Sequence, residues 1–241
     1  MNKKELEARE PEFVREYLGE KPPGFFIEVG ANDPKFHSQT WHLEERGWRG
    51  ALVEPLPEKA AALRRERPGS RVFEAACSSA DKVGEATFHI GEWDEHSSLE
   101  QGIDDPTVRY PRSVTVKVLT LDQVLEEMKP ARVDFVSIDT EGTELAILKG
   151  FNLERWRPRL ILIEDKVHSL DKHRHLKRHG YRLVKRTSFN NWYVPRDAAR
   201  PAATMEERWN LVRKMYIATP WRVAKLWLHR WQAKSGARPA A

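Results

Sequence analysis

Two acidic residues and a glycine stand where predicted strands end in the first quarter of the chain. In FIEVGAND, Glu28 lies inside an apolar run, Gly30 ends it and Asp33 follows, while the next run, GALVEP, closes on Glu54. In a parallel sheet such strand ends form a ligand crevice, and a glycine lets the backbone approach the ligand closely. Because carboxylates attract cations and repel phosphates, we expect a positively charged ligand without phosphate.

The spacing of the glycines excludes the common phosphate-binding loops. A dinucleotide-binding turn needs GxGxxG, yet the next glycine after Gly30 is Gly47, and the chain contains no GxxxxGK[ST]. Glu54 follows Gly30 at about the spacing at which an acid meets ribose hydroxyls in doubly wound folds. A cationic nucleoside with a bare ribose fits these features, and S-adenosylmethionine is such a compound. The alternative is that Gly30 only turns the chain and Glu54 only ends a strand.

A second group of reactive side chains follows two later apolar runs. Asp139 and Glu141 come after VDFVSI, and Glu164 and His168 come after LILI. A hydroxyl acceptor loses its proton during methyl transfer, so these residues are the candidate base and its partners. His168 has the intrinsic pKa best suited to this task, but it could equally be a solvent histidine ahead of a basic helix. The cluster could also hold a divalent metal, which we do not favour because the spacing matches no tight metal motif.

Acceptor-binding residues are expected on long or aromatic loop segments. Residues 91–112 show neither a helical nor a strand period, and loops of this length are commonly functional. Aromatic rings and hydroxyl groups suit a sugar ring, although the segment could also be an ordinary exposed insertion, and Trp192 could belong to the core. The candidates for substrate binding are His37, Trp93, His96, Ser97, Ser98, Asn191 and Trp192.

The elements that must position these side chains alternate between strand-like and helix-like segments. Strands are predicted at residues 25–29, 51–54, 72–75, 133–138, 160–164 and 181–184, with a late antiparallel strand at 189–194 and an inserted hairpin at 84–90 and 114–118. Helices are predicted at residues 39–46, 57–67, 121–128, 143–148 and 172–179. Thr120 and Gln123 have the spacing of a capping box. The pattern predicts an α/β domain with a mostly parallel sheet.

Composition indicates one main domain with a distinct tail. The chain has 241 residues, 40% of them apolar, and Cys77 is its only cysteine, which favours a reducing compartment. No signal peptide or spanning segment is evident at the start, so we expect a cytoplasmic protein. We expect a helical lead-in at residues 1–23, a ligand-binding domain at 24–195 and a basic, tryptophan-rich helical extension at 196–241.

The extension carries the positive charge of the chain. Residues 181–241 contain 13 Lys and Arg against 3 Asp and Glu, which leaves residues 1–180 with a net charge of −5. Two amphipathic helices are predicted there. The first would place Met205, Trp209, Val212 and Met215 on one face, and the second Trp221, Ala224, Trp227, Leu228 and Trp231, with Arg222, Lys225, His229, Arg230 and Lys234 mostly away from that stripe. Such helices lie on membrane surfaces, pack on their own domain or join two subunits in a homo-oligomer.

Several segments together resemble the FkbM-type S-adenosylmethionine-dependent methyltransferases. The resemblance covers residues 24–195 and rests on FIEVGAND with Ser38, on GWRGALVEP, on EAACSS, on LTLDQVL and on VDFVSIDTEGTELAILKGF. Pro34 stands where many members have glycine. The resemblance implies a Rossmann-like class I methyltransferase fold with a mostly parallel seven-stranded sheet and helices on both faces.

The resemblance also implies roles for individual residues. Those around the methionine part would be Glu28, Gly30, Ala31, Asn32, Asp33 and Ser38, with Glu54 on the ribose and Ala76 and Cys77 at the adenine edge. Cys77 would be a wall and not a nucleophile. The expected activity is O-methylation of a small-molecule or glycan hydroxyl, with a saccharide preferred because of the family. The alternatives are a nucleic-acid methyltransferase, disfavoured by the acidic main domain, and a non-catalytic membrane-surface module.

Overall fold

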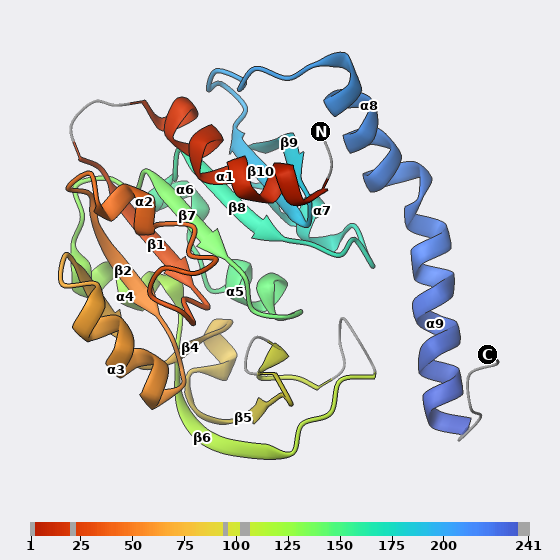
Figure 1. Cartoon of the computed structure of the whole chain (residues 1–241), viewed down its shortest axis with the longest axis horizontal. Coiled ribbons are helices and arrows are strands. Elements are labelled where there is room, and N and C mark those ends of the chain that lie inside the picture. The colour runs from red at the N-terminus through yellow and green to blue at the C-terminus, as the bar shows by residue number, and fades with distance from the viewer. Residues whose placement is uncertain (1–2, 20–22, 94–95, 102–106, 236–241) are drawn as a thin grey trace.

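The computed structural model describes residues 3–19, 23–93, 96–101 and 107–235, without the side chains of residues 3, 4 and 229–235. Within these ranges a central sheet has seven strands in the order β3-β2-β1-β7-β8-β10-β9 (Figure 1). They are β1 (Phe25–Val29), β2 (Arg49–Val53), β3 (Ser70–Phe73), β7 (Phe135–Ile138), β8 (Leu160–Glu164), β9 (Tyr181–Thr187) and β10 (Asn190–Pro195). Strands β3, β2, β1, β7 and β8 run parallel to one another, and β10 is antiparallel to both β8 and β9. The predicted mostly parallel sheet with one late antiparallel strand is confirmed.

Helices cover both faces of this sheet because its central strands are apolar on both sides. Every residue of β7 and β8 is buried, which is why these strands read as continuous apolar runs. One face is covered by α4 (Leu121–Met128), α5 (Glu144–Lys149), α6 (Leu153–Trp156) and α7 (Asp171–Arg178). The other is covered by α1 (Lys3–Leu18), α2 (Trp41–Glu44) and α3 (Pro57–Glu66). The capping box predicted at the start of α4 is present, with Thr120 and Gln123 bonded reciprocally.

A smaller sheet lies beside the carboxyl ends of the main strands. Its order is β4-β6-β5, from β4 (Ala76–Cys77), β6 (Arg112–Leu119) and β5 (Gly84–Ile90), with a 3-10 turn, η1 (Ala80–Lys82), before β5. The hairpin of β5 and β6 is the predicted insertion. Its apolar side chains Phe88, Ile90 and Val116 pack with Leu56, which lies between β2 and α3, so the small sheet closes one end of the region where β2 terminates.

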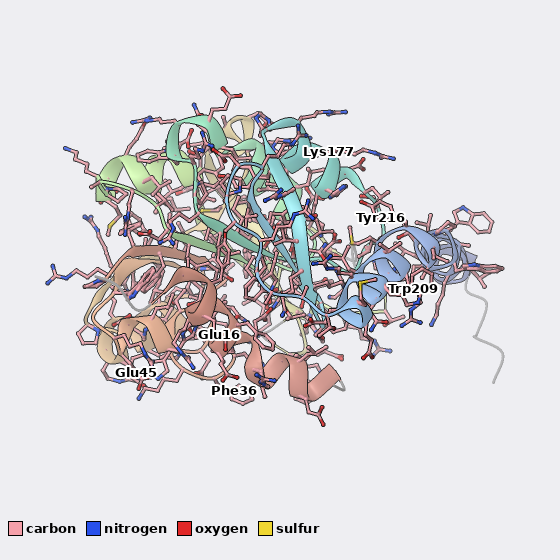
Figure 2. All side chains as sticks on the ribbon, turned by 90° about the horizontal axis from the view of Figure 1, so that it is seen from above. Glu16, Phe36, Glu45, Lys177, Trp209 and Tyr216 are labelled. Atoms are coloured by element: carbon pink, nitrogen blue, oxygen red, sulfur yellow. The ribbon has the colours of Figure 1, made fainter. Side chains whose placement is uncertain are left out.

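The chain ends in a helical arm that stands away from the main body (Figures 1 and 2). We call α8 (Met205–Val212), the π-helical turn η3 (Arg213–Ile217) and α9 (Thr219–Ser235) the C-terminal arm. Along the predicted stripe of the first helix, Met215 is buried, but Met205, Trp209 and Val212 are exposed. The π turn changes the helical phase before Met215, which separates it from the other three. Among the described residues, no helix combines the length and the apolar character needed to cross a bilayer.

Candidate functional site

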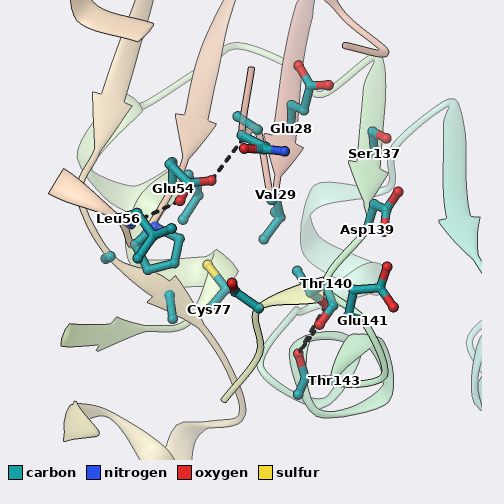
Figure 3. Close-up of a pocket in the computed structure, with 18 of the residues that line it drawn as sticks. Glu28, Val29, Glu54, Leu56, Cys77, Ser137, Asp139, Thr140, Glu141 and Thr143 are labelled. Carbon is teal, nitrogen blue, oxygen red and sulfur yellow. Dashed lines mark hydrogen bonds between the residues drawn. The ribbon is translucent and has the colours of Figure 1, made fainter. Parts of the chain in front are cut away.

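A cavity of about 1150 Å³, including the part open to solvent, lies where β1, β2 and β7 end (Figure 3). Here the chain order of the sheet reverses, with β2 on one side of β1 and β7 on the other, which is where open α/β sheets bind ligands. The carboxylates that line it are Glu28, Asp33, Glu54, Asp139 and Glu141. No lysine or arginine is among the described residues of this wall. The cavity therefore favours a cation over a phosphorylated ligand.

Gly30 allows the chain to turn tightly at the end of β1. Its φ is +81°, and a Cβ at this position would lie 1.9 Å from the carbonyl oxygen of Asp139. The amides of Gly30 and Ala31 both donate to the carbonyl of Val53, at 3.0 and 3.2 Å. Only glycine fits this backbone conformation and this close approach between the ends of β1 and β7.

Glu28 holds the loop that follows β1. Its carboxylate accepts hydrogen bonds from the Ser38 hydroxyl at 2.8 Å, from the amide of Gln39 at 2.7 Å and from the Thr40 hydroxyl. Arg67, wholly buried, lies 3.9 Å from Glu28 and also donates to Ser38 and Thr40. Burial raises the pKa of Glu28, and Arg67 opposes that rise. Much of the acceptor capacity of Glu28 is thus used inside the protein.

Glu54 faces the cavity, and two backbone amides hold its carboxylate in place. One carboxylate oxygen accepts from the amide of Asn32 and the other from the amide of Leu56, both at 2.9 Å (Figure 3). Burial raises the pKa of Glu54 to about 7. Each oxygen keeps further acceptor capacity toward the cavity, which a ribose hydroxyl could use.

The cavity end nearest the small sheet is apolar. Ala75, Ala76, Cys77, Leu56 and Phe88 line it. Cys77 is buried, and burial raises the pKa of its thiol to about 12, so the thiol stays neutral. Such a surface suits a flat heteroaromatic ring.

The opposite side of the cavity holds an acidic cluster formed by Asp139, Glu141 and Glu164, with one carboxylate oxygen of each within 4.8 Å of the others. Burial raises the pKa of Glu164, and the neighbouring Asp139 and Glu141 raise it further. The pKa of Asp139 is raised chiefly by desolvation in the cavity wall and then by the charges of Glu141 and Glu144, although its side chain is exposed to the open cavity. The side chains of Glu164 and Asp139 interact with each other, and the pKa of each is raised. The two groups are therefore suited to share one proton near neutrality.

Two lysines neutralise part of this acidic charge. The ammonium of Lys166 lies 2.6 Å from Glu141 and 3.8 Å from Glu164. The ammonium of Lys172 lies 3.1 Å from the wholly buried Glu144. Glu144 also accepts from the amides of Thr140 and Gly142, so it shapes the loop after β7. The acidic cluster has the donor set for a divalent metal, but Lys166 already supplies a positive charge beside it.

The structure places all but one of the predicted cofactor residues in the wall of the cavity. Glu28, Gly30, Ala31, Asn32, Asp33, Glu54, Ala76 and Cys77 all line it. Ser38 lies instead between Glu28 and Arg67, so it supports the loop without forming part of the described wall. Asp33 accepts from the amides of Lys35 and Phe36, and the first of these bonds is the largest cause of its lowered pKa.

The predicted catalytic residues separate into two groups. Asp139 and Glu141 line the cavity, and Glu164 contacts Asp139 from the next strand. His168 is not among the residues of the described wall. This placement favours the carboxyls over the histidine as proton acceptors.

The predicted acceptor residues are only partly brought together. His37 and Ser97 line the cavity, and the ring of His37 stacks on Phe36 at 3.9 Å between centroids. Ser98 is buried, and its hydroxyl donates to the carbonyls of Thr140 and Glu141. Trp93 and His96 are not part of the described wall, and residues 94–95 and 102–106 of the predicted lid lie outside the described residues.

Asn191 and Trp192 lie away from the cavity. For Trp192 the sequence had left open a place in the core, and the structure places it there. Both are wholly buried in β10. The amide of Asn191 donates to Asp165, and the indole of Trp192 donates to Glu10 and Thr187. Their polar groups are thus used in holding α1 and the loop after β8, and the geometry gives them no contact with an acceptor in the cavity.

Several residues of the site were missed in the sequence. They are Phe36, Arg67, Thr140, Glu144 and Lys166. Phe36 is adjacent to the predicted His37 and could have been found with it. Arg67 sits at the end of the arginine-rich stretch LRRER, and nothing in that stretch distinguishes the one arginine that turns inward.

Comparisons with known proteins identify a family for most of the chain. The family described as "Methyltransferase FkbM domain" matches residues 28–183. No curated protein matches the chain. Solved structures with a similar fold include the N-terminal domain of human METTL16 in complex with SAH, at 13% identity over 78% of this chain and 68% of that chain, with a TM-score of 0.44. Another is a precorrin-6y C5,15-methyltransferase from Geobacter metallireducens, at 14% identity over 80% and 88% of the two chains, with a TM-score of 0.38.

Proposed function

The chain belongs to the FkbM domain family of methyltransferases, and we propose that it transfers a methyl group to a hydroxyl of a saccharide or of a glycan-linked acceptor. It is an S-adenosylmethionine-dependent methyltransferase with a Rossmann-like class I fold. The observation that carries the proposed acceptor chemistry is the placement of Asp139, Glu141 and Glu164 beside the cavity, with one carboxylate oxygen of each within 4.8 Å of the others. The preference for a saccharide comes from the family.

The cavity residues fit S-adenosylmethionine. Its positive charges would meet a wall of carboxylates, its ribose would meet Glu54, and its adenine would lie in the apolar end near Cys77. Gly30 supports the fit, because a Cβ there would fill the close approach at the end of β1. When bound, the cofactor supplies an electrophilic methyl group on its sulfonium.

Asp139 is the proposed base. In its ionised form it accepts the proton of the acceptor hydroxyl, while Glu164 keeps its own proton and donates to Asp139. Lys166 stabilises the negative charge of the acidic cluster. A placed base of this kind accelerates a reaction by about 10²–10⁴-fold.

The neighbouring residues orient the acceptor and limit the access of water. Ser98 joins the segment 96–101 to the loop after β7, and Ser97 and Leu99 of that segment line the cavity. Phe36 and His37 offer stacked rings on the opposite side. Methyl transfer is an in-line displacement, so holding the hydroxyl collinear with the reacting bond contributes much of the acceleration.

The test is incubation of the protein with methyl-labelled S-adenosylmethionine and a panel of sugars, sugar nucleotides, glycolipids and RNA. We expect label on a hydroxyl of a saccharide-containing acceptor. Two results would contradict the proposal. One is label on RNA bases. The other is label on an amine or a carbon atom of an acceptor with none on any hydroxyl.

Two variants then test the roles of the two sides of the cavity. Asp139→Asn should lower kcat by about 10²–10⁴-fold and leave cofactor affinity unchanged. Glu54→Ala should weaken cofactor affinity by about tenfold or more, because a buried ribose loses its charged acceptor. Asp81→Asn and Glu58→Ala are the matched controls, since both side chains are exposed. If Asp139→Asn and Glu54→Ala both behave as their controls, the site lies elsewhere.

A further inference from the structure

The C-terminal arm exposes many large apolar side chains that do not pack against the main body. Trp209, Trp221 and Trp227 are 58%, 80% and 66% exposed. Among the side chains of the arm that the structure describes, the other exposed apolar ones are Met205, Val212, Tyr216, Ile217, Val223 and Leu228. Contiguous exposed apolar surface of this kind marks an interaction site.

The charge of the arm indicates what kind of surface it meets. After Glu207 the chain contains no aspartate or glutamate, and its lysines and arginines are Arg208, Arg213, Lys214, Arg222, Lys225, Arg230, Lys234 and Arg238. The main body, in contrast, is net negative over residues 1–180. An anionic surface is therefore the complementary partner for the arm, and the arm is the part of the chain that suits it.

In α9 the helical period places the apolar stripe and the basic residues mostly on different sides. Trp221, Ala224, Trp227 and Leu228 recur at the spacing of one helical face, and Lys225 falls outside it. Tryptophan prefers the boundary between lipid headgroups and acyl chains, where its ring is buried and its N–H stays hydrated. A basic side chain beside the stripe, such as that of Lys225, can reach the headgroup phosphates.

The arm is attached to the main body through α8, η3 and the first turn of α9, and the rest of α9 extends away from the body (Figure 2). In η3, the buried Met215 accepts from the amide of Asn191, and the hydroxyl of Tyr216 lies 3.2 Å from His173. At the start of α9, the guanidinium of Arg222 donates to the carbonyl of Lys166 at 3.3 Å. Lys166 also contacts the acidic cluster, so the anchor of the arm adjoins the acceptor side of the cavity.

We propose that the C-terminal arm docks on the surface of an anionic lipid bilayer, with the tryptophans of α8 and α9 in the headgroup region. Pairing of two copies through α9 would bring basic residues together without any acid in α9 to offset them. A nucleic acid would match the charge but would leave the aliphatic side chains Val223 and Leu228 in water. Docking does not depend on the identity of the acceptor, and it would hold the acceptor side of the cavity near lipid-borne molecules.

The test is co-sedimentation of the full chain with vesicles of phosphatidylcholine alone or with about one third phosphatidylglycerol. We expect at least tenfold stronger binding to the anionic vesicles, and weaker binding as salt is raised. Trp221→Ser with Trp227→Ser, and separately Arg213→Glu with Lys225→Glu, should each lower this binding by about tenfold or more, since one basic residue near the surface contributes about a fivefold change.

Matched controls separate the arm from general stickiness. Trp93→Ser removes an exposed tryptophan of the body, and Lys82→Glu with Lys117→Glu reverses two exposed charges there. We expect both controls to bind vesicles as the natural chain does, and all variants to retain cofactor affinity, which shows that the body is folded.

Three results would overturn the proposal. The first is equal binding to neutral and anionic vesicles, or no loss of binding in the arm variants. The second is a dimer in solution that Trp221→Ser with Trp227→Ser dissociates, which would make the arm an interface between copies. The third is RNA binding that Arg213→Glu with Lys225→Glu abolishes in a chain that does not bind vesicles.

Discussion

The two sides of the cavity use carboxylates in different ways. On the cofactor side, Glu28 and Glu54 accept hydrogen bonds from backbone amides and hydroxyls of the loops that follow β1 and β2. On the acceptor side, Asp139 and Glu164 face each other. Burial raises the pKa of carboxyls on both sides, but backbone donors oppose the rise on the first and neighbouring acids add to it on the second.

This difference separates binding from chemistry. A carboxylate held by several fixed donors keeps its position whether or not a ligand is present, which suits recognition of a cationic nucleoside. A pair of carboxyls that share a proton changes its protonation near neutrality, which suits removal of a proton from a hydroxyl. Three changes in the chain can break or sharpen the contrast.

The largest effect is expected from Gly30→Ala on the cofactor side. The added Cβ would meet the carbonyl of Asp139 at 1.9 Å in a left-handed backbone, so the turn must open. We expect a loss of about 3 kcal/mol or more in the free energy of unfolding, measured with urea, together with at least 100-fold weaker cofactor binding by calorimetry.

Gly180→Ala is the matched control for this change. Gly180 has the same φ of +81° and no atom within 4 Å of the added Cβ. The Gly180→Ala variant should lose only the backbone-strain contribution, roughly 1–2 kcal/mol in the free energy of unfolding, and should bind the cofactor normally. Equal losses in the two variants would show that the close approach at the end of β1 is unimportant.

A smaller effect is expected from Lys166→Met on the acceptor side. Turnover should rise with pH, because the acid that takes the proton must be ionised and its pKa is raised. Removing the ammonium near Glu141 and Glu164 should raise the pKa values of the acidic cluster further. The rising limb of the kcat profile should then move to higher pH, while Lys82→Met leaves it in place. An unchanged profile would exclude the acidic cluster as the titrating group.

The smallest effect is expected from Glu164→Gln on stability. An acid whose pKa is higher in the folded state than in the unfolded state stabilises the fold fully below its unfolded pKa, and this stability is lost as pH rises through the folded pKa. Glu164 has such a raised pKa. The variant should therefore be more stable than the natural chain at pH 8, by roughly 1–3 kcal/mol, and similar to it at pH 4. A lower Tm at pH 8 would contradict the assignment.

Much of the fold and part of the site could be predicted because both depend on short-range patterns. Apolar runs bounded by turns set the strands, and the capping box at Thr120 set the start of α4. Since parallel strands end at one edge of a sheet, Gly30, Glu54 and Asp139 were expected together and do line one cavity. Their predicted roles await the experiments above.

The rest depended on contacts between distant parts of the chain. Asn191 and Trp192 were expected at the acceptor, but β10 is buried on both faces, so its sequence shows no alternation that tells which side chains reach a cavity. The inward turn of Arg67 depends on Glu28 and Glu44, which come from other elements. The pairing of Lys166 with Glu141 likewise joins the loops after β8 and β7.

The sequence by itself therefore determined where the strands lie along the chain, the tight turn at Gly30 and the placement of acids at three strand ends. Each of these is a local property of the backbone or of its hydrophobic period. Only the tertiary structure decided which acids meet amides and which meet one another, and that the arm leaves its tryptophans exposed. These features arise from the free energy of burying charges and apolar surface in one particular packing, which no local period records.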